Sequence, residues 1–228
     1  MLIEQLPIIL LGFTLGMMHA LDADHVMAVS SLSNQKPSLR RTVLFSANWA
    51  IGHGSVLVIS GLLLFGLGIA LPEALIHVAE MSVGVLLIVL GLYSFWQFRQ
   101  QKVVITKHRH GDVEHSHWHH DEHGKDVDQS ATKDGHLPVM VGVLHGLAGS
   151  APALALIPAI GQTELSVVIG YLLMFSIGVM LSMMAFGLGL GSLQGLLKQR
   201  YDMLFYWSRR VIALASTLLG CFWLYQAV

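Results

Sequence analysis

The chain has 228 residues, of which 54% are hydrophobic and only 12% are charged, and apolar runs of about twenty residues recur along it. This composition predicts an all-α integral membrane protein in contact with the lipid bilayer. The net charge of −1, without a basic stripe and interleaved aromatic residues, argues against a nucleic-acid partner. The single cysteine, Cys221, excludes a disulfide within the chain and a cysteine-based zinc site.

Six apolar runs are long enough to cross about 30 Å of hydrocarbon. We expect transmembrane helices at residues 6–31, 43–70, 75–98, 137–160, 165–191 and 209–227. The first run has no positively charged segment before it, so we expect it to be kept as a helix and not removed as a signal peptide.

All thirteen lysines and arginines fall in the first, third and fifth connections between these helices or, for Arg209 and Arg210, at the start of the helix that follows the fifth connection. Basic loops are retained in the cytoplasm during insertion. The third connection is therefore expected in the cytoplasm, with both termini outside. We expect a multi-pass protein of the bacterial cytoplasmic (inner) membrane.

The chain divides into two halves of three helices each. Residues 1–98 form the first three-helix repeat, 99–136 a cytoplasmic loop, and 137–228 the second three-helix repeat. An odd number of helices in each half inserts the halves from opposite sides, which predicts a 3+3 inverted repeat.

Short matches between the halves support the duplication. Gly16-x-x-His19-x-Leu21 returns as Gly142-x-x-His145-x-Leu147, and Ile51-Gly52 returns as Ile177-Gly178. Both matches have a shift of 126 residues. The alternative is coincidence, because Gly and Leu are common in membrane helices.

Four ionisable side chains interrupt the first apolar run: His19, Asp22, Asp24 and His25. An acid at mid-membrane depth costs about 2.5–3.5 kcal/mol, which a bound cation would offset. On a regular helix His19, Asp22 and His25 share one face, and Asp24 points nearly the other way. Asp24 would then either orient another ligand or join the site through local unwinding of the helix. Two imidazoles and a carboxylate suit a borderline divalent metal such as Ni, Co or Zn. The alternative is a buried polar network that only locks helices together.

Two further histidines lie in apolar helices. His53 falls in the second helix at a depth near that of His19, and His145 occupies the repeat position of His19 in the fourth helix. We expect both to contact the metal, with helix packing as the alternative.

The long loop is rich in histidines and acids, cannot bury a core, and is expected to be disordered. Short histidine spacings chelate metals readily. The candidate residues for metal capture are His108, His110, His115, His117, His119, His120 and His123. The alternative is a solvated spacer.

The motif His19-x-x-x-x-Asp24-His25 resembles the signature of the nickel/cobalt transporter (NiCoT) family. The run Asn48-Trp49-Ala50-Ile51-Gly52-His53-Gly54 resembles the second motif of that family, and His145-Gly146-Leu147-Ala148-Gly149 its glycine-rich motif. The resemblance implies metal selection by the first motif. Six helices and a histidine-rich loop are closer to the efflux branch than to the eight-helix importers.

We therefore expect a secondary transporter, not an enzyme, that moves nickel or cobalt ions, with no permanent cofactor and the ion as substrate. The residues expected to bind the ion are His19, Asp22, Asp24, His25 and His53, and His145 is expected to close the site. Efflux is slightly favoured; the alternative is a nickel uptake permease supplying urease or hydrogenase. Lesser alternatives are a metal-buffering membrane accessory protein and an intramembrane metallo-enzyme. Protons compete for the imidazole nitrogens, which offers a basis for proton-coupled exchange. The sequence is compatible with a homo-oligomer.

Overall fold

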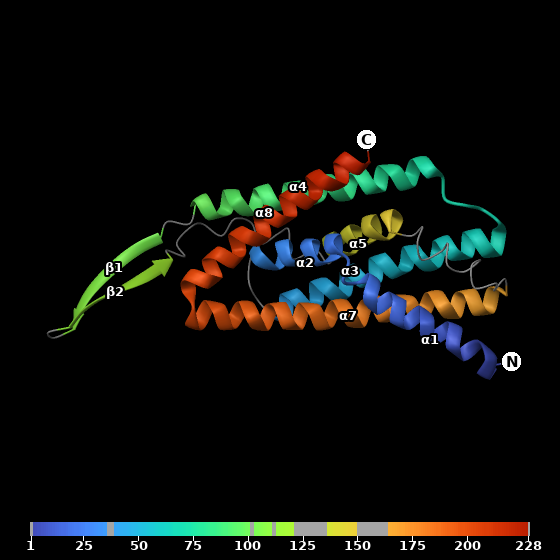
Figure 1. Cartoon of the computed structure of the whole chain (residues 1–228), viewed down its shortest axis with the longest axis horizontal. Coiled ribbons are helices and arrows are strands. Elements are labelled where there is room, and N and C mark those ends of the chain that lie inside the picture. Colours follow the sequence, from blue (N-terminus) through green and yellow to red (C-terminus); the bar gives the residue numbers. More distant parts are fainter. Residues whose placement is uncertain are drawn as a thin grey trace.

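The computed structural model describes residues 2–35, 39–100, 103–110, 113–120, 136–149 and 164–227. This part of the chain is a bundle of α-helices with a two-stranded hairpin extending from one end (Figure 1). In chain order the elements are α1 (Leu2–His19), α2 (Ala23–Gln35), α3 (Leu39–Gly61), the π-helical turn η1 (Leu62–Gly66), α4 (Glu73–Gln100), β1 (Val103–His110), β2 (Val113–His120), α5 (His136–Ala148), α7 (Leu165–Arg200) and α8 (Asp202–Gln226).

The helix expected at 6–31 is broken in the structure. α1 ends at His19, α2 begins at Ala23, and the two segments are bent by 55°. The span expected at 6–31 therefore consists of two helices, and the local unwinding considered for this run is present between them. Asp24 falls in the first turn of α2, where the free amides of a helix N-terminus favour a carboxylate. The break lies inside the polar motif, so it changes how the motif's side chains are directed.

Three helices of the described residues are long and apolar enough to cross a membrane: Thr42–Gly66, Glu73–Arg99 and Leu165–Arg200. The bent pair α1 and α2 gives a fourth span if it is counted as one. The chain is therefore a multi-pass, helical membrane protein.

The remaining two predicted spans have a different outcome. The segment expected at 209–227 lies within α8, which is a helix but is not among the candidate spans. The helix expected at 137–160 is described only as α5, a shorter apolar helix, and its second half lies outside the described residues. Six spans thus remain a prediction.

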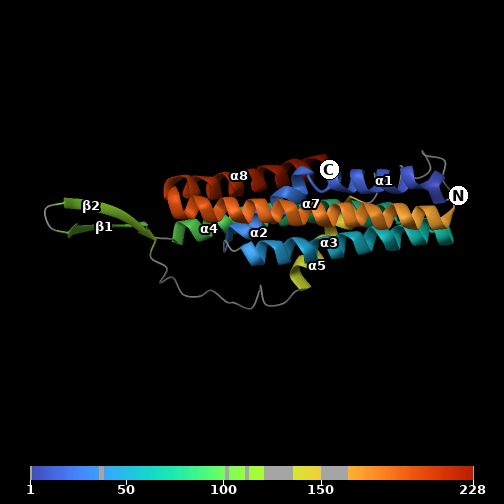
Figure 2. The same cartoon turned by 90° about the horizontal axis from the view of Figure 1, so that it is seen from below.

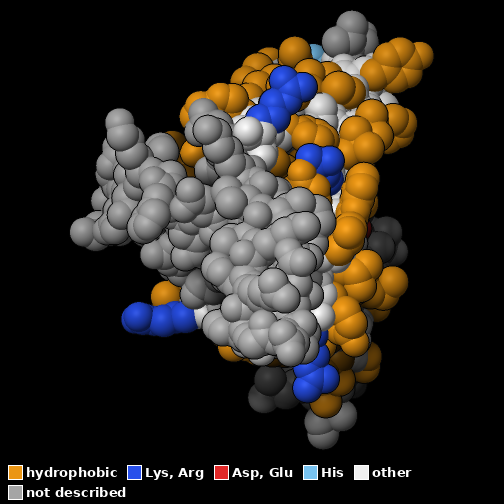
Figure 3. Space-filling view, turned by 90° about the vertical axis from the view of Figure 1, so that its left-hand side faces the viewer, with side chains coloured by type: hydrophobic (Ala, Val, Ile, Leu, Met, Phe, Trp, Pro, Cys, Tyr) orange, Lys and Arg blue, Asp and Glu red, His pale blue; other side chains and the backbone are white. Residues whose placement is uncertain are grey.

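The helices pack in four main pairs within the described chain. α1 packs on α7, α5 packs on α3, and α4 packs on α8, while α3 and α7 also lie against each other (Figure 1, Figure 2). The N-terminus lies at the end of the bundle opposite the hairpin. Lys and Arg side chains are visible at the hairpin end (Figure 3). We call this end the basic end, because Arg40 lies in the first turn of α3 there and Lys198 and Arg200 lie in the last turn of α7.

Glycines bring the pairs into backbone contact, and they do so reciprocally. A Cβ on Gly16 of α1 would clash with the Phe175 carbonyl oxygen of α7, and a Cβ on Gly142 of α5 would clash with the Trp49 carbonyl oxygen of α3. Gly16 and Gly142 are 126 residues apart, and so are Trp49 and Phe175. The two contacts are the same contact, made once by each half.

A second pair of contacts repeats the relation. A Cβ on Gly178 would clash with the Phe13 carbonyl oxygen, and a Cβ on Gly52 with the Val139 carbonyl oxygen. These positions also differ by 126 residues. Small residues that let helix backbones touch are the usual means of packing in membranes, where apolar side chains gain little from leaving lipid.

The loop that we expect to be disordered contains the two strands. β1 and β2 pair antiparallel, with His108 opposite His115. The segment Val103–Thr106 is a run of β-branched residues, which favours extended backbone. This local preference for extended backbone explains why strands form here, although the composition of the whole loop favours disorder.

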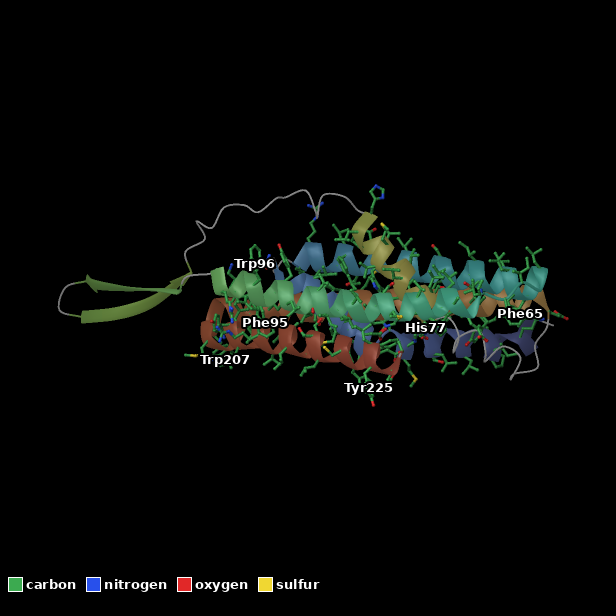
Figure 4. All side chains as sticks on the ribbon, turned by 90° about the horizontal axis from the view of Figure 1, so that it is seen from above. Phe65, His77, Phe95, Trp96, Trp207 and Tyr225 are labelled. Atoms are coloured by element: carbon green, nitrogen blue, oxygen red, sulfur yellow. The ribbon has the colours of Figure 1, made fainter. Side chains whose placement is uncertain are left out.

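Two tryptophans lie near the basic end of the bundle. Trp96 on α4 and Trp207 on α8 are 49% and 53% exposed and lie at the hairpin side (Figure 4). Tryptophans gather where a membrane meets water, because the ring is apolar and the N–H is polar. Their position is consistent with a membrane boundary near this end.

Candidate metal site

Three histidines meet inside the bundle. One ring nitrogen from each of His19, His25 and His53 lies within 4.8 Å of the others. The residues come from the end of α1, the start of α2 and the middle of α3. His25 and His53 are 1% and 0% exposed. A metal bound at about 2.1 Å from each nitrogen needs nitrogens about 3.4 Å apart, so small ring movements suffice.

The break between α1 and α2 creates this arrangement. Without it, the helix would carry His19 and His25 nearly two turns apart along one axis. With the chain bent, the two ring centroids lie 4.7 Å apart, and each is within 5.3 Å of the His53 ring centroid. The side chains of the polar motif therefore converge on one region and do not line one face of a helix.

Each carboxylate of the motif holds one imidazole. His19 Nδ1 donates to Asp22 Oδ2 at 2.7 Å, and His25 Nδ1 donates to Asp24 Oδ1 at 2.9 Å. Asp24 is buried, whereas the Asp22 side chain is 54% exposed. A carboxylate on Nδ1 fixes the tautomer in which Nε2 carries a lone pair, as is common for metal-binding histidines. In this structure both acids face histidine nitrogens, in the outer shell of the cluster.

His145 joins the cluster from the second half. Its ring centroid lies 5.4 Å from that of His25, and the side chain is 0% exposed. His145 Nδ1 donates to the Val141 carbonyl oxygen at 2.8 Å, one turn back on α5. A Cβ on Gly149, just past the end of α5, would lie 3.5 Å from His19 Nε2. Glycine at this position leaves the space beside His19 open.

The inward nitrogens have no partners. Among the described residues, no hydrogen bond reaches Nε2 of His19, His25 or His145, or either nitrogen of His53. Buried polar atoms are nearly always hydrogen-bonded, so several unpaired nitrogens around one point need an explanation. Neutral imidazoles with free lone pairs are ligands for Ni, Co, Cu or Zn and poor ligands for Mg or Ca.

Two aromatic side chains that the sequence analysis did not single out as site residues enclose the cluster. Trp49 stacks on His53 with ring centroids 5.0 Å apart, and Phe175 lies 5.4 Å from His19. Trp49 also contacts the edges of His25 and His145. The 126-residue shift, which relates Trp49 to Phe175, was the signal that could have found this pair. Both exclude water from the histidines.

The structure brings together His19, Asp22, Asp24, His25, His53 and His145. It places the loop candidates elsewhere: His108, His110, His115, His117, His119 and His120 are in the hairpin, and His123 lies outside the described residues.

We expect Asp24→Asn to weaken metal binding without removing a ligand. The amide could reverse the hydrogen bond and turn the His25 lone pair away from the cluster. Loss of a residue that orients a metal ligand typically lowers metal affinity by about 10–100-fold. We therefore expect the affinity of Asp24→Asn to fall by at least about tenfold. Isothermal titration of the purified protein with Ni²⁺ measures the change. Asp22→Asn, which changes the exposed acid, is the comparison. An unchanged affinity for Ni²⁺ in Asp24→Asn would contradict the role of Asp24 in orienting His25.

Residues 10–222 match the family described as the cytochrome c biogenesis protein transmembrane region. The chain belongs to this family. The match covers nearly all the described helices. It supports a membrane transporter family, and the chain is not an enzyme.

The family member is also similar to a urease accessory protein. Urease accessory protein UreH from Bacillus sp. (strain TB-90) is 29% identical over 185 residues, which cover 81% of this chain and 76% of that protein. No solved structure matches the chain.

Proposed function

We propose that this family member is a secondary transporter that takes up nickel ions, with cobalt as a related substrate. The observation that carries the proposal is the cluster of His19, His25 and His53, with inward nitrogens unpaired in the interior of an apolar bundle. A purely structural network would pair those nitrogens. The ion is the passing substrate and not a resident cofactor, and His145 completes the set of ligands.

The likeness to a urease accessory protein supports uptake over efflux. The histidine-rich loop had slightly favoured efflux, but a cytoplasmic loop can also receive metal after entry. We propose that uptake supplies nickel to a nickel enzyme. Efflux is the alternative, and the nickel content of cells lacking the protein, described below, distinguishes it from uptake.

The reciprocal glycine contacts support an inverted repeat as the frame of the transporter. Gly16 on Phe175 and Gly142 on Trp49 are one contact made twice, with the partners exchanged. We propose six spans in a 3+3 arrangement, with both termini outside and the basic end in the cytoplasm. In this arrangement the histidine cluster lies where the two halves meet, as sites of inverted-repeat transporters do.

A metal-buffering accessory protein is the rival. Its metal would bind mainly to the loop, and the buried histidines would contribute little. Burial of the cluster between four helices argues against a buffer, since a buffer needs rapid access from solution.

Nickel flux into proteoliposomes tests the proposal. We expect time-dependent Ni²⁺ entry with the wild-type protein, loss of that flux in His19→Ala, and retention of most of it after deletion of residues 108–135. Flux that survives His19→Ala rejects the site, and flux that disappears with the loop favours the buffer. Nickel content of cells lacking the protein gives the direction: uptake predicts less nickel.

A further inference from the structure

The buried residues of α3 and α7 differ in chemistry on the two sides of the histidine cluster. Towards the basic end they include Thr42 and Ser46 on α3 and Ser182 on α7, which are 1%, 0% and 8% exposed. Towards the opposite end the buried residues next to the cluster include aliphatic ones. These are Val56 and Leu57 on α3 and Val168 and Leu172 on α7.

The internal repeat makes this comparison position by position. A shift of 126 residues relates Thr42 to Val168 and Ser46 to Leu172. The same shift relates Val56 to Ser182. In each pair the hydroxyl lies on the side of the basic end, and the aliphatic residue lies on the other side.

Exceptions lie on both sides: Met183 of α7, the repeat partner of Leu57, is fully buried towards the basic end, and two hydroxyls are buried on the opposite side. Ser60 and Tyr171 carry buried hydroxyls there. Ser60 is beyond Leu57 along α3, and the Tyr171 ring lies against Gly12 of α1. The aliphatic layer next to the cluster is therefore not interrupted at the three repeat-related positions.

Thr42 and Ser46 lie where α3 touches α7. Ser46 Oγ donates to the Thr42 carbonyl oxygen at 2.9 Å, and a Cβ on Gly187 of α7 would lie 2.6 Å from Ser46 Oγ. Gly187 carries no side chain, so Ser46 Oγ lies directly against the backbone of α7 at this point. On the opposite side, Val168, Leu172 and Leu57 belong to one hydrophobic cluster that fills the interface.

The polar surface continues to the basic end. Gln194 follows Gly187 by seven residues, which places it on the same face of α7, two turns further. Its side chain is 2% exposed, and neither amide atom has a partner among the described residues. Beside it, an open cavity of about 380 Å³ is lined by residues that include Leu39, Gly191 and Lys198.

We infer that Thr42, Ser46 and Ser182 line the route by which the ion passes between the histidine cluster and the basic end. Gln194 marks the mouth of this route, and the aliphatic residues Val56, Val168 and Leu172 form the gate on the other side. Hydroxyl and amide oxygens can replace part of the water shell of a divalent cation, whereas an aliphatic constriction excludes water and ions. The inference rests on the proposed transport function for its substrate, but the asymmetry of access can be tested without any metal.

Cysteine accessibility tests the route. The background is Cys221→Ser, which removes the single native thiol. Thr42→Cys, Ser46→Cys and Ser182→Cys are each compared with the repeat-related variant: Val168→Cys, Leu172→Cys and Val56→Cys. The probe is a charged, membrane-impermeant methanethiosulfonate reagent, applied to membrane vesicles of either orientation.

We expect at least tenfold faster modification at 42, 46 and 182 than at their partners, and only with the basic end exposed to the reagent. Equal rates within each pair, or faster reaction at 168, 172 and 56, would overturn the route. A wild-type protein that neither binds nor carries nickel removes the proposed function, yet the thiol rates still decide the route.

Replacing the hydroxyl residues by the aliphatic residues of their repeat partners gives a second test. Thr42→Val with Ser46→Leu copies the aliphatic layer to the basic side. We expect nickel flux to fall at least tenfold while the Kd for Ni²⁺ changes less than twofold. Thr42→Val alone, which keeps the side-chain shape, serves if the double variant does not fold. Wild-type flux in a folded variant would contradict the route.

Discussion

His25→Ala is expected to abolish nickel transport and to weaken nickel binding by more than about 100-fold, exceeding the 10–100-fold typical of an outer-shell change. His25 is 1% exposed, and its ring is the member of the cluster nearest to both His19 and His145. Alanine removes a lone pair that no neighbour can replace. It also leaves Asp24 buried without its hydrogen-bond partner.

The control for this variant is His77→Ala. His77 is an exposed histidine on α4 and lies outside the cluster (Figure 4). We expect its flux and affinity to match the wild type. Isothermal titration gives the affinity, and ⁶³Ni²⁺ entry into proteoliposomes gives the flux. Normal flux in His25→Ala, or an equal loss in His77→Ala, would refute the assignment of the site.

Gly16→Ala and Gly142→Ala are expected to destabilise the folded protein by similar amounts. In each variant the new methyl group meets a backbone carbonyl oxygen of the facing helix, which a change of rotamer cannot move. Overpacking of this kind costs about 1–3 kcal/mol or more. Because the two glycines make the same contact in the two halves, the proposed inverted repeat predicts matched losses.

The matched control is Gly189→Ala. Gly189 lies within α7, and a Cβ there would meet nothing within 4 Å. Alanine in an open helical position is expected to stabilise by about 0.5–1 kcal/mol. Thermal unfolding in detergent measures all three variants. A loss confined to one of Gly16→Ala and Gly142→Ala would show that the halves do not share this contact.

The apolar runs and the polar motif were readable from the sequence, because each depends on residue type and local spacing. The motif His19 to His25 was recognisable because ionisable groups are costly in an apolar run. The 126-residue shift was visible in single glycines and histidines, and it also relates the helix contacts. Histidines far apart in the chain were expected to meet, and the structure places His53 and His145 beside the motif.

The roles of the acids and the path of the first helix depended on tertiary structure. Periodicity assumes an unbroken helix, so it could not place the break after His19 or turn Asp24 towards His25. The hydrogen bond from His145 Nδ1 to the Val141 carbonyl oxygen decides that Nε2 is the nitrogen that faces the cluster. Composition determined that this chain enters a membrane and carries histidines and carboxylates with it. Only the packing of α1, α3, α5 and α7 decided that those side chains point at one another, because convergence depends on backbone contacts between helices that are remote in sequence.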